Sequence, residues 1–456
     1  MTHVHFIGIG GTGLSAIARV LLEEGYTVSG SDRTGSPLFN AITAAGALTF
    51  LGHDASQING ADLVIRSSAV SDDNPEVTAA LDAGIPVMKR SEFLAELTQG
   101  KDTLAVAGSH GKTTTTAMLI WVLTQLGTDP SFIAGGVVNQ LGTNARAGSG
   151  QYFAIEADEY DNMFLGLAPK IAVVTNIEHD HPDCFPTRED YRAAFKAFLR
   201  KVRPDGLALV CWDDAGARSL AEECTSEIAI LGYGSSPEAT YKAVDIRVEN
   251  GLPVFSFCRN DLLLGEVRLS IPGRHNVINA TAALAVVHQL GLDLKAAVRA
   301  LGAFTGAGRR FEILGTGNGV TVIDDYGHHP TELAATLQAA KSRYSGRRVW
   351  AVWQPHTFTR TRTLESDFIR ALSTADMAVV LKIYAAREAD PGYSAARIAE
   401  AMPKEKAMYC ESFDAASAFL LEKLLPGDVM IVFSAGDATE VSQAVLNGLR
   451  QRERED

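Results

Sequence analysis

The chain has 456 residues, of which 46% are hydrophobic and 21% are charged, a composition typical of a globular protein with about two to four domains. Its net charge of −13 argues against a nucleic-acid partner, and the lack of an apolar run of about 18 residues argues against a membrane span. Five scattered cysteines without C-x-x-C spacing, and an N-terminus that reads as a strand instead of a cleavable leader, predict a cytoplasmic protein with neither disulfides nor a zinc site.

Strand-like and helix-like segments alternate almost throughout, which is typical of doubly wound α/β domains. The first block predicts strands that end at Ile7 and cover 26–32, 61–68 and 86–90, with helices near 13–24 and 91–98. The second predicts strands before Gly108 and over 152–158 and 170–177, a helix near 188–202, a small antiparallel addition over 240–272, and helices over 276–290 and 294–301. The third predicts strands over 320–326, 348–354, 377–384 and 428–434. We therefore expect three domains, covering 1–100, 101–303 and 304–456.

The first predicted strand runs into a glycine-rich turn that precedes a helix. The turn matches G-x-G-x-x-G and consists of Gly8, Ile9, Gly10, Gly11, Thr12 and Gly13, and Asp32 ends the next strand. Such a turn places a diphosphate at a helix N-terminus, and an acidic residue in the position of Asp32 can bind ribose hydroxyls. The motif fits a dinucleotide or a UDP-linked ligand, and we favour UDP because a separate ATP loop follows.

The segment around Lys112 predicts an ATP-binding loop. An apolar strand leads into a turn and a hydroxyl-rich helix start, and the candidate residues are Gly108, Ser109, His110, Gly111, Lys112, Thr113 and Thr114. Backbone N–H groups and the helix dipole attract phosphate there, Lys112 adds a mobile charge, and Thr113 can offer its hydroxyl to Mg²⁺. The full Walker spacing is absent, because Val106 occupies its first glycine position.

Acidic and histidine residues follow two further strands of this block. Glu156, Asp158, Glu159 and Asp161 follow one strand, and the segment Thr175–His181 follows the other. Since the carboxyl ends of parallel strands meet at one sheet edge, we expect these side chains to converge and to bind the Mg²⁺ that accompanies ATP.

The remaining candidates lie at the start of a helix and in the third block. His275 and Asn276 open a helix and are placed to flank an adenine, while Arg310 lies at the second domain boundary, where it could reach a γ-phosphate on closure. Third-block strands are followed by two clusters that resemble a carboxylate-recognition surface. These clusters contain Asp324, Asp325, Tyr326, His328 and His329 in one case, and His356, Arg360 and Arg362 in the other.

Taken together, these motifs resemble the Mur ligase family over essentially the whole chain. The matching segments, in order, are GIGGTGLS, SSAVSDDNPE, AGSHGKTTTTAM, EADEYD, TNIEHDHPD, GRHNVINA, GAGRRF, DDYGHHPTE and QPHTFTRTR. The resemblance implies an N-terminal Rossmann-like UDP-sugar domain, a central P-loop ATPase domain and a C-terminal Rossmann-like domain that receives an amino acid. It also implies an enzyme that forms an amide from a carboxylate and an amine, and converts ATP to ADP and phosphate.

The same resemblance assigns roles by position. Catalytic roles fall on Lys112, Glu156, His181, Arg310, His356 and Arg360. Mg²⁺ ligation falls on Thr113, Glu156 and His181, and the ATP pocket and domain closure on His275, Asn276, Asn279, Arg310 and Asp325. UDP-sugar binding extends to Ser67 and Ser68, and amino-acid binding involves Tyr326, His329, His356 and Arg360.

Within the family, the segments DDYGHHP and QPHTFTR favour the branch that joins L-alanine to UDP-N-acetylmuramate in peptidoglycan precursor synthesis. Two positions depart from that pattern. Tyr160 stands where many of these enzymes carry serine, and the tripeptide-recycling branch shares the tyrosine. Thr357 replaces an arginine. The alternatives are therefore a tripeptide-recycling ligase and, from other classes, an NAD-dependent oxidoreductase or a non-catalytic nucleotide-binding regulator. A monomer or a homodimer is expected.

Overall fold

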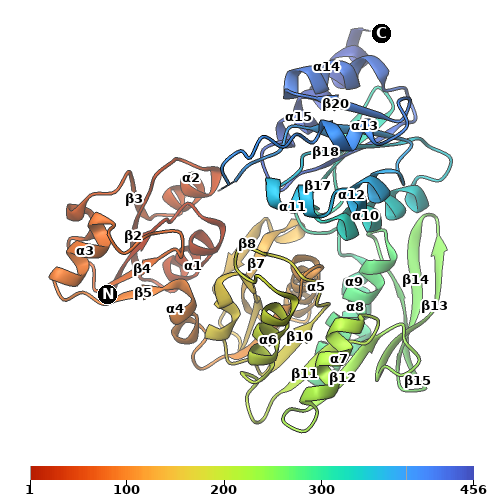
Figure 1. The fold of residues 1–456 in the computed structure, drawn as a ribbon. Helices are drawn as coiled ribbons and strands as arrows, with labels where there is room; N and C mark the ends of the chain where they lie inside the picture. The colour runs from red at the N-terminus through yellow and green to blue at the C-terminus, as the bar shows by residue number, and fades with distance from the viewer. Residues whose placement is uncertain (1, 387, 456) are drawn as a thin grey trace. The chain divides into compact units, whose positions relative to one another are not determined.

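The computed structural model describes residues 2–386 and 388–455, and the chain divides into two compact units. Unit 1 comprises Met1–Val244, Ser256–Val267 and Ile278–Phe304, and unit 2 comprises Asp245–Phe255, Arg268–Val277 and Thr305–Asp456. Within the described residues the strands form three sheets, of five, ten and six strands (Figure 1). This confirms the predicted α/β class with three sheet domains, while the exact domain boundaries stay a prediction. In the described part of the chain, no helix is both long and apolar enough to cross a membrane.

The N-terminal sheet is parallel, with the order β3-β2-β1-β4-β5. Its elements are β1 His3–Ile7, α1 Thr12–Glu23, β2 Thr27–Asp32, α2 Pro37–Ala44, β3 Leu48–Leu51, η1 Ala55–Ile58, β4 Leu63–Arg66, α3 Pro75–Asp82, β5 Val87–Lys89 and α4 Arg90–Leu97. The chain leaves β1 toward β2 on one side and returns to β4 on the other, so the strand order reverses between β1 and β4. Ligands of open α/β sheets bind at such a reversal, outside the carboxyl ends of the strands.

The central sheet has the order β15-β14-β13-β12-β11-β10-β6-β9-β7-β8. Its first elements are β6 Asp102–Ala107, α5 Lys112–Gln125, β7 Ser131–Val138, η2 Asn139–Leu141, β8 Thr143–Arg146, β9 Tyr152–Glu156, η3 Tyr160–Gly166 and β10 Ile171–Val174. They are followed by α6 Arg188–Leu199, β11 Leu207–Cys211, α7 Ala215–Cys224 and β12 Ile230–Gly234. Because β6 pairs in parallel with both β9 and β10, the segments that follow these three strands lie at one sheet edge.

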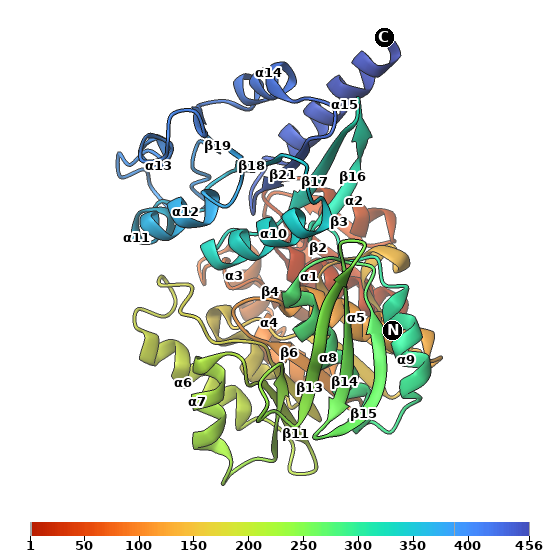
Figure 2. The ribbon, with the colours of Figure 1, turned by 90° about the vertical axis from the view of Figure 1, so that its right-hand side faces the viewer.

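Three long strands form the end of the central sheet that lies opposite β8 (Figure 2). They are β13 Tyr241–Glu249, β14 Leu252–Arg259 and β15 Leu262–Arg268, and they precede α8 Arg274–Gln289 and α9 Leu294–Gly302. Asn250 and Gly251 turn the chain between the first two strands, and both adopt positive φ. Two-residue turns of this kind join antiparallel strands, as predicted for residues 240–272.

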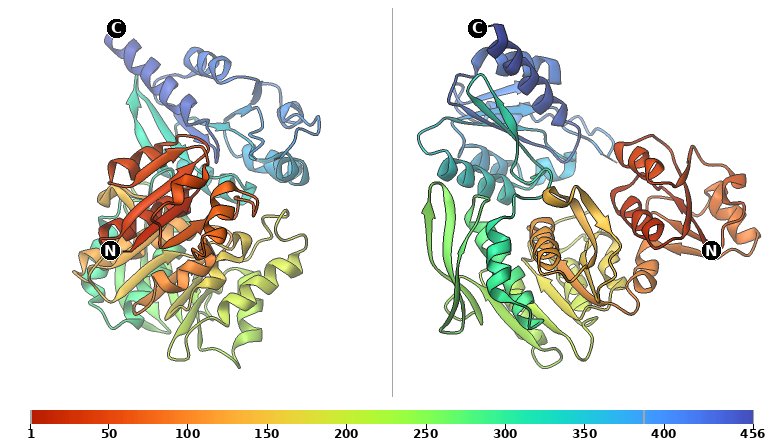
Figure 3. Two further views of the ribbon diagram at one scale, coloured as in Figure 1. Left: turned by 90° about the vertical axis from the view of Figure 1, so that its left-hand side faces the viewer. Right: turned by 180° about the vertical axis from the view of Figure 1, so that it is seen from behind.

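The C-terminal sheet has the order β16-β17-β21-β18-β19-β20, and its pairs are parallel except for the edge strand β16. Its elements are β16 Glu312–Gly317, β17 Val320–Asp325, α10 Pro330–Arg343, β18 Val349–Trp353, α11 Phe358–Thr363, α12 Glu365–Leu372, β19 Met377–Leu381, α13 Ala396–Glu400, β20 Ala407–Cys410, α14 Phe413–Lys423, β21 Val429–Phe433 and α15 Thr439–Glu455 (Figure 3). The fully buried Trp350 and Trp353 side chains lie on β18 in the middle of this sheet. The carboxyl ends of β17 and β18 carry the third-block candidates, and β21 lies between these two strands.

Candidate functional site

The loop between β6 and α5 has the backbone geometry of a phosphate-binding turn. Gly108 and Gly111 both adopt positive φ, of 137° and 81°. A Cβ atom at Gly108 would overlap the Thr175 hydroxyl, and one at Gly111 would lie 2.9 Å from Oδ1 of Asn279. Both positions therefore need glycine, and the turn is seated against the end of β10 and the side of α8.

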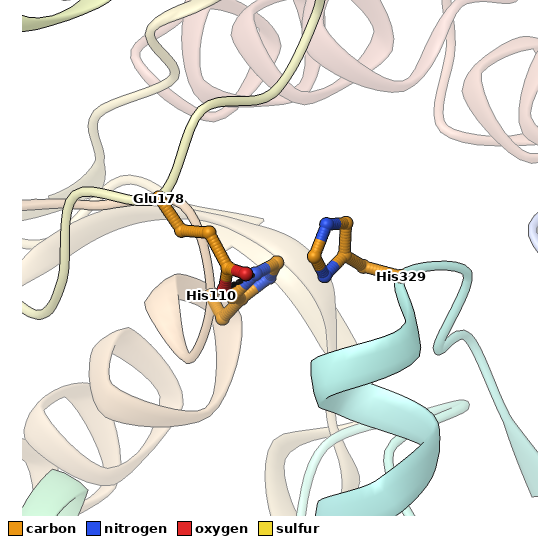
Figure 4. Close-up of side chains that lie close together, drawn as sticks. All are labelled: His110, Glu178 and His329. Carbon is orange, nitrogen blue, oxygen red and sulfur yellow. Dashed lines mark hydrogen bonds and ion pairs between the residues drawn. The ribbon is translucent and has the colours of Figure 1, made fainter. Parts of the chain in front are cut away.

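Side chains that follow β10 hold this loop in place. Asn176 Oδ1 accepts a hydrogen bond of 2.8 Å from the His110 amide, and the Ser109 hydroxyl donates to the Glu178 carbonyl at 2.7 Å. The Ser109 hydroxyl also lies 2.9 Å from the Tyr191 hydroxyl. His110 Nε2 lies 3.1 Å from Oε2 of Glu178, and Figure 4 shows these two side chains side by side. The loop is thus held by hydrogen bonds within the protein itself, and such preorganisation lowers the entropy cost of binding a nucleotide.

Lys112 is folded back onto the loop and onto a buried carboxylate. Its Nζ donates to the Gly108 carbonyl at 2.5 Å and lies 2.8 Å from Oε2 of Glu159. Burial alone would lower the pKa of Lys112, but the carboxylates of Glu159 and Asp158 outweigh burial and raise it. The lysine is therefore protonated beside the predicted phosphate position, and these contacts hold its ammonium group in place, whereas the sequence predicted a mobile charge.

Glu156 ends β9 with its carboxylate held by two donors. The Thr113 hydroxyl donates to Oε1 at 3.0 Å, and the Gly135 amide donates to Oε2 at 2.6 Å. Gly135 lies on the neighbouring strand β7, and a side chain there would take the space of this carboxylate. Thr113 and Glu156 thus present two oxygen atoms side by side, which is the kind of ligand that Mg²⁺ prefers.

His181 lies where the two acidic segments meet. Its Nε2 is 3.7 Å from Oε1 of Glu159 and 3.8 Å from Oδ2 of Asp180. The Tyr160 ring meets the imidazole edge-on with centroids 5.1 Å apart, and its hydroxyl donates to Asp183 at 2.9 Å. The predicted convergence of the segments after β9 and β10 is therefore confirmed, while the metal-binding roles of Glu156 and His181 stay a prediction.

The glycine turn after β1 lies at the reversal of the N-terminal sheet. Gly8 has a φ of 91°, and its amide donates to the Ser31 carbonyl at 2.8 Å. A Cβ atom at Gly8 would lie 3.2 Å from Cβ of Ser67, the residue that follows β4. Asp32 Oδ2 accepts a 2.9 Å hydrogen bond from the Gly10 amide, so this carboxylate braces the turn whether or not it also meets a ribose.

The turn leads directly into α1, whose N-terminus is exposed. Gly11 is the N-cap and has no side-chain hydrogen bond, Thr12 opens the helix, and both are exposed. Gly13 follows, half-buried, and Ser68 lies exposed after Ser67. The first turn of a helix leaves backbone N–H groups without partners inside the helix, so this end of α1 is open to an anion.

In unit 2, two arginines enclose the tyrosine that follows β17. The guanidinium carbons of Arg309 and Arg310 each lie 5.1 Å from the centre of the Tyr326 ring. Arg310 Nη1 lies 3.7 Å from Oε1 of Glu332. Burial raises the pKa of Asp325 to about 6, although Arg310 and the amides of residues 311 and 327 oppose the shift. Two guanidinium groups therefore lie beside the end of β17, together with the carboxylates of Asp325 and Glu332.

The segment after β18 places an imidazole and a guanidinium together. Arg360 is buried, and its Nη1 lies 3.2 Å from Nδ1 of His356. The His356 ring stacks on Tyr384 with centroids 5.8 Å apart and lies 5.7 Å from the His328 ring. Thr357 adopts a φ of 65°, which is strained for a β-branched residue and sharpens the turn into α11.

Three other predicted residues lie at helix starts. His329 is the N-cap of α10 and lies at the start of that helix (Figure 4), and its Nδ1 accepts a 3.4 Å hydrogen bond from the Thr331 amide. At the start of α8, His275 is exposed, whereas Asn276 is buried and donates to the Pro272 carbonyl at 2.7 Å. These contacts give His329 and Asn276 a structural role, and their ligand roles stay a prediction.

Sequence reasoning missed the residues that support the site from other elements. Gly135 and Tyr191 lie outside every motif, and Asn176, although inside one, gave no sign that it holds the loop. Arg90 and Tyr384 were also missed. A glycine in an otherwise strand-like segment, as at Gly135, was the one available signal of a close approach.

Comparison with known proteins identifies the family. The chain matches the models for the Mur ligase family catalytic domain over residues 3–102, the Mur ligase middle domain over 106–287, and the Mur ligase glutamate ligase domain over 309–436. The chain belongs to the Mur ligase family.

Relatives and solved structures agree with this. The chain is 44% identical over 450 residues to proteins named UDP-N-acetylmuramate–L-alanine ligase from Carboxydothermus hydrogenoformans and Paenarthrobacter aurescens, with 98% of this chain and 96% and 97% of those proteins covered. Its fold is similar to the crystal structure of UDP-N-acetylmuramate-alanine ligase from Thermotoga maritima, with a TM-score of 0.84, 28% identity and full coverage of both chains. A murein peptide ligase from Psychrobacter arcticus gives a TM-score of 0.71 and 26% identity over 99% of both chains.

Proposed function

We propose that this protein is an ATP-dependent ligase that joins L-alanine to the lactyl carboxylate of UDP-N-acetylmuramate and releases ADP and phosphate. The names of the relatives at 44% identity support the two substrates. The observation that carries the chemistry is the loop after β6, where Lys112, Thr113 and the carboxylate of Glu156 gather at one sheet edge. An oxidoreductase would leave this second nucleotide loop without a purpose.

The site residues suit a two-step activation of the carboxylate. A carboxylate is a poor electrophile, so one of its oxygens first attacks the γ-phosphorus of ATP and ADP leaves, which yields an acyl phosphate. The neutral amine of L-alanine then attacks the carbonyl carbon, loses a proton, and phosphate departs. Lys112 and Arg310 would offset the negative charge that builds on the transferring phosphoryl group.

The donor set beside Lys112 fits a magnesium ion. Thr113 and Glu156 offer two oxygens that lie 3.0 Å apart, and His181 supplies a nitrogen, a less usual ligand for this hard cation. When bound, Mg²⁺ would neutralise phosphate charge on the nucleotide. The Thr113 hydroxyl and the Glu156 carboxylate would hold the ion, and the hydrogen bond from the Gly135 amide keeps that carboxylate in position.

The amine site is assigned to the end of β18 in unit 2. The buried Arg360 guanidinium can form a paired contact with the carboxylate of an amino acid. Tyr326 lies against Arg309 and Arg310, and His356 lies against Arg360. We propose that Arg360 binds the carboxylate of L-alanine and that His356 and Tyr326 line the same pocket.

The proposal is tested by measuring phosphate release with ATP, Mg²⁺, UDP-N-acetylmuramate and a panel of amines. We expect release to need the sugar nucleotide and the amine together, with L-alanine the best substrate and no change in NADH absorbance. A tripeptide accepted better than L-alanine would move the protein to the recycling branch, an outcome that the Tyr160 departure makes worth including. The Lys112→Ala variant is the inactive control. Gel filtration tests the expected monomer or homodimer.

A further inference from the structure

An arginine outside all the motifs covers the glycine turn of the N-terminal sheet. Arg90 opens α4, and its guanidinium occupies the space that a side chain at position 13 would need, because a Cβ atom at Gly13 would overlap Arg90 Nη1. The last glycine of the G-x-G-x-x-G turn therefore makes room for a cation on the first turn of α1.

This placement puts two positive features together. The N-terminus of a helix carries a partial positive charge, and α1 has neither an acidic residue in its first turn nor a side-chain cap at Gly11. Arg90 forms an ion pair with Asp158, at 3.6 Å between Nη2 and Oδ2, and the Asp158 side chain is 40% exposed. Burial lowers the pKa of Arg90, although Asp158 and Asp161 oppose the shift. The guanidinium is thus held by a long contact whose carboxylate partner is open to solvent.

We propose that Arg90 binds the diphosphate of the sugar nucleotide together with the first turn of α1, and that the diphosphate displaces Asp158 from the guanidinium. This inference rests on the proposed function, since it names a residue of the same UDP-sugar site. A guanidinium can hold two oxygens of a phosphate at once, and the unpaired amides at the start of α1 supply further donors. The long, displaceable contact with Asp158 keeps the guanidinium in place until the ligand arrives.

The rival explanation is that Arg90 only ties α4 to the segment that follows β9. The two explanations differ in what Asp158 does. If the pair is purely structural, its loss should destabilise unit 1 and leave diphosphate affinity unchanged. If Asp158 competes with the ligand, its removal should tighten diphosphate binding.

The test measures UDP and uridine binding to the full chain by calorimetry, without ATP or Mg²⁺. For Arg90→Ala we expect UDP affinity to fall by about tenfold to a hundredfold, as for loss of a hydrogen-bonded charge, with uridine affinity unchanged. Arg90→Lys should recover part of the loss, because it keeps the charge without the fork. Arg19→Ala is the matched control, since Arg19 lies later on α1 and pairs only loosely with Glu23, at 4.0 Å.

Asp158→Asn keeps Arg90 and removes its competitor, so UDP should bind about twofold to tenfold tighter. Unchanged UDP affinity in a folded Arg90→Ala protein would overturn the inference. If that variant does not fold, Asp158→Asn decides: tighter UDP binding supports the inference, and equal or weaker binding overturns it. If the unaltered protein binds neither UDP nor UDP-N-acetylmuramate, the proposed function itself has failed.

Discussion

Replacing Gly135 by alanine tests the Glu156 site by adding a single methyl group beside its carboxylate. The new Cβ atom would lie 2.6 Å from Oε1 and 2.7 Å from Oε2 of Glu156, whereas ordinary contacts begin at 3.4 Å. The carboxylate must therefore retreat by about 0.8 Å, and its 2.6 Å bond from the residue 135 amide is lost or bent. Gly135 is exposed and its φ is not positive, so alanine strains neither the backbone nor the core.

The size of the effect follows from the bond that is lost. A hydrogen bond to a charged group contributes about 1.5–3 kcal/mol, so the Mg²⁺ concentration for half-maximal rate should rise about tenfold to 150-fold, since about 1.4 kcal/mol is a factor of ten. The assay is the initial rate of ADP formation against Mg²⁺ concentration. Direct Mn²⁺ binding, measured by electron paramagnetic resonance, separates metal affinity from catalysis.

Gly265→Ala is the control for this experiment, because its Cβ atom would meet only Val298, at an ordinary 3.6 Å. That variant should keep both the metal dependence and the melting temperature of the unaltered protein. A Gly135→Ala protein that folds normally and shows unchanged Mg²⁺ and Mn²⁺ dependence would refute the assignment of Glu156 as a metal ligand.

Three further predictions concern separate parts of the chain. Lys112→Ala should abolish turnover yet keep UDP-sugar binding, because the two glycine turns lie on different sheets; calorimetry that finds this binding lost would contradict the separation of sites. Arg360→Lys should raise the KM for L-alanine strongly and change the ATP and UDP-sugar constants little, as a lysine cannot reproduce the planar fork; glycine and L-serine should stay poorer substrates, by about 1–3 kcal/mol. Burial raises the pKa of Asp325 from 3.8 to about 6, so between these values the folded chain binds a proton that the unfolded chain has lost, and the free energy of unfolding falls as pH rises. Relative to Asp325→Asn, urea titrations should show the unaltered protein losing about 2 kcal/mol between pH 4 and 7, and parallel profiles would rule this out.

The parts of the fold that the sequence predicts well are buried strands with a clear apolar run. Residues 320–326 and 348–354 were expected as strands and form β17 and β18 within one residue at each end. The strands that were not predicted are β3, β7, β8, β11, β12, β16 and β20. Several are edge or interrupted strands: β7 contains the pair Gly135–Gly136, and the edge strand β16 exposes Ile313. The glycine pair and the exposed edge interrupt the pattern on which prediction depends, but β11 was missed although it is a buried apolar run.

The candidate site shows a similar division. Motif residues such as Lys112 and Glu156 can be recognised in the sequence, because their chemistry needs a fixed spacing relative to a strand end. The residues that hold them in place cannot be recognised in this way. Gly135 and Tyr191 come from other elements, whose neighbours are set only by the sheet order and by helix packing. The prediction for Asp32 lies between these cases: its place at the end of β2 was foreseen, while its bond to the Gly10 amide was not.

The short segment after β9 provides the counter-charge for both nucleotide loops of unit 1. Glu159 pairs with Lys112 on the ATP loop, and Asp158 pairs with Arg90 over the other glycine turn. The first pair is buried, with oxygen and nitrogen 2.8 Å apart, whereas the second is longer and its carboxylate is exposed. The Asp158 carboxylate also helps to raise the pKa of Lys112, so its displacement by a diphosphate would change the electrostatic surroundings of that lysine. Binding of the sugar nucleotide would then alter the charge balance at Lys112, which predicts that UDP changes ATP affinity in the unaltered protein but not in Asp158→Asn.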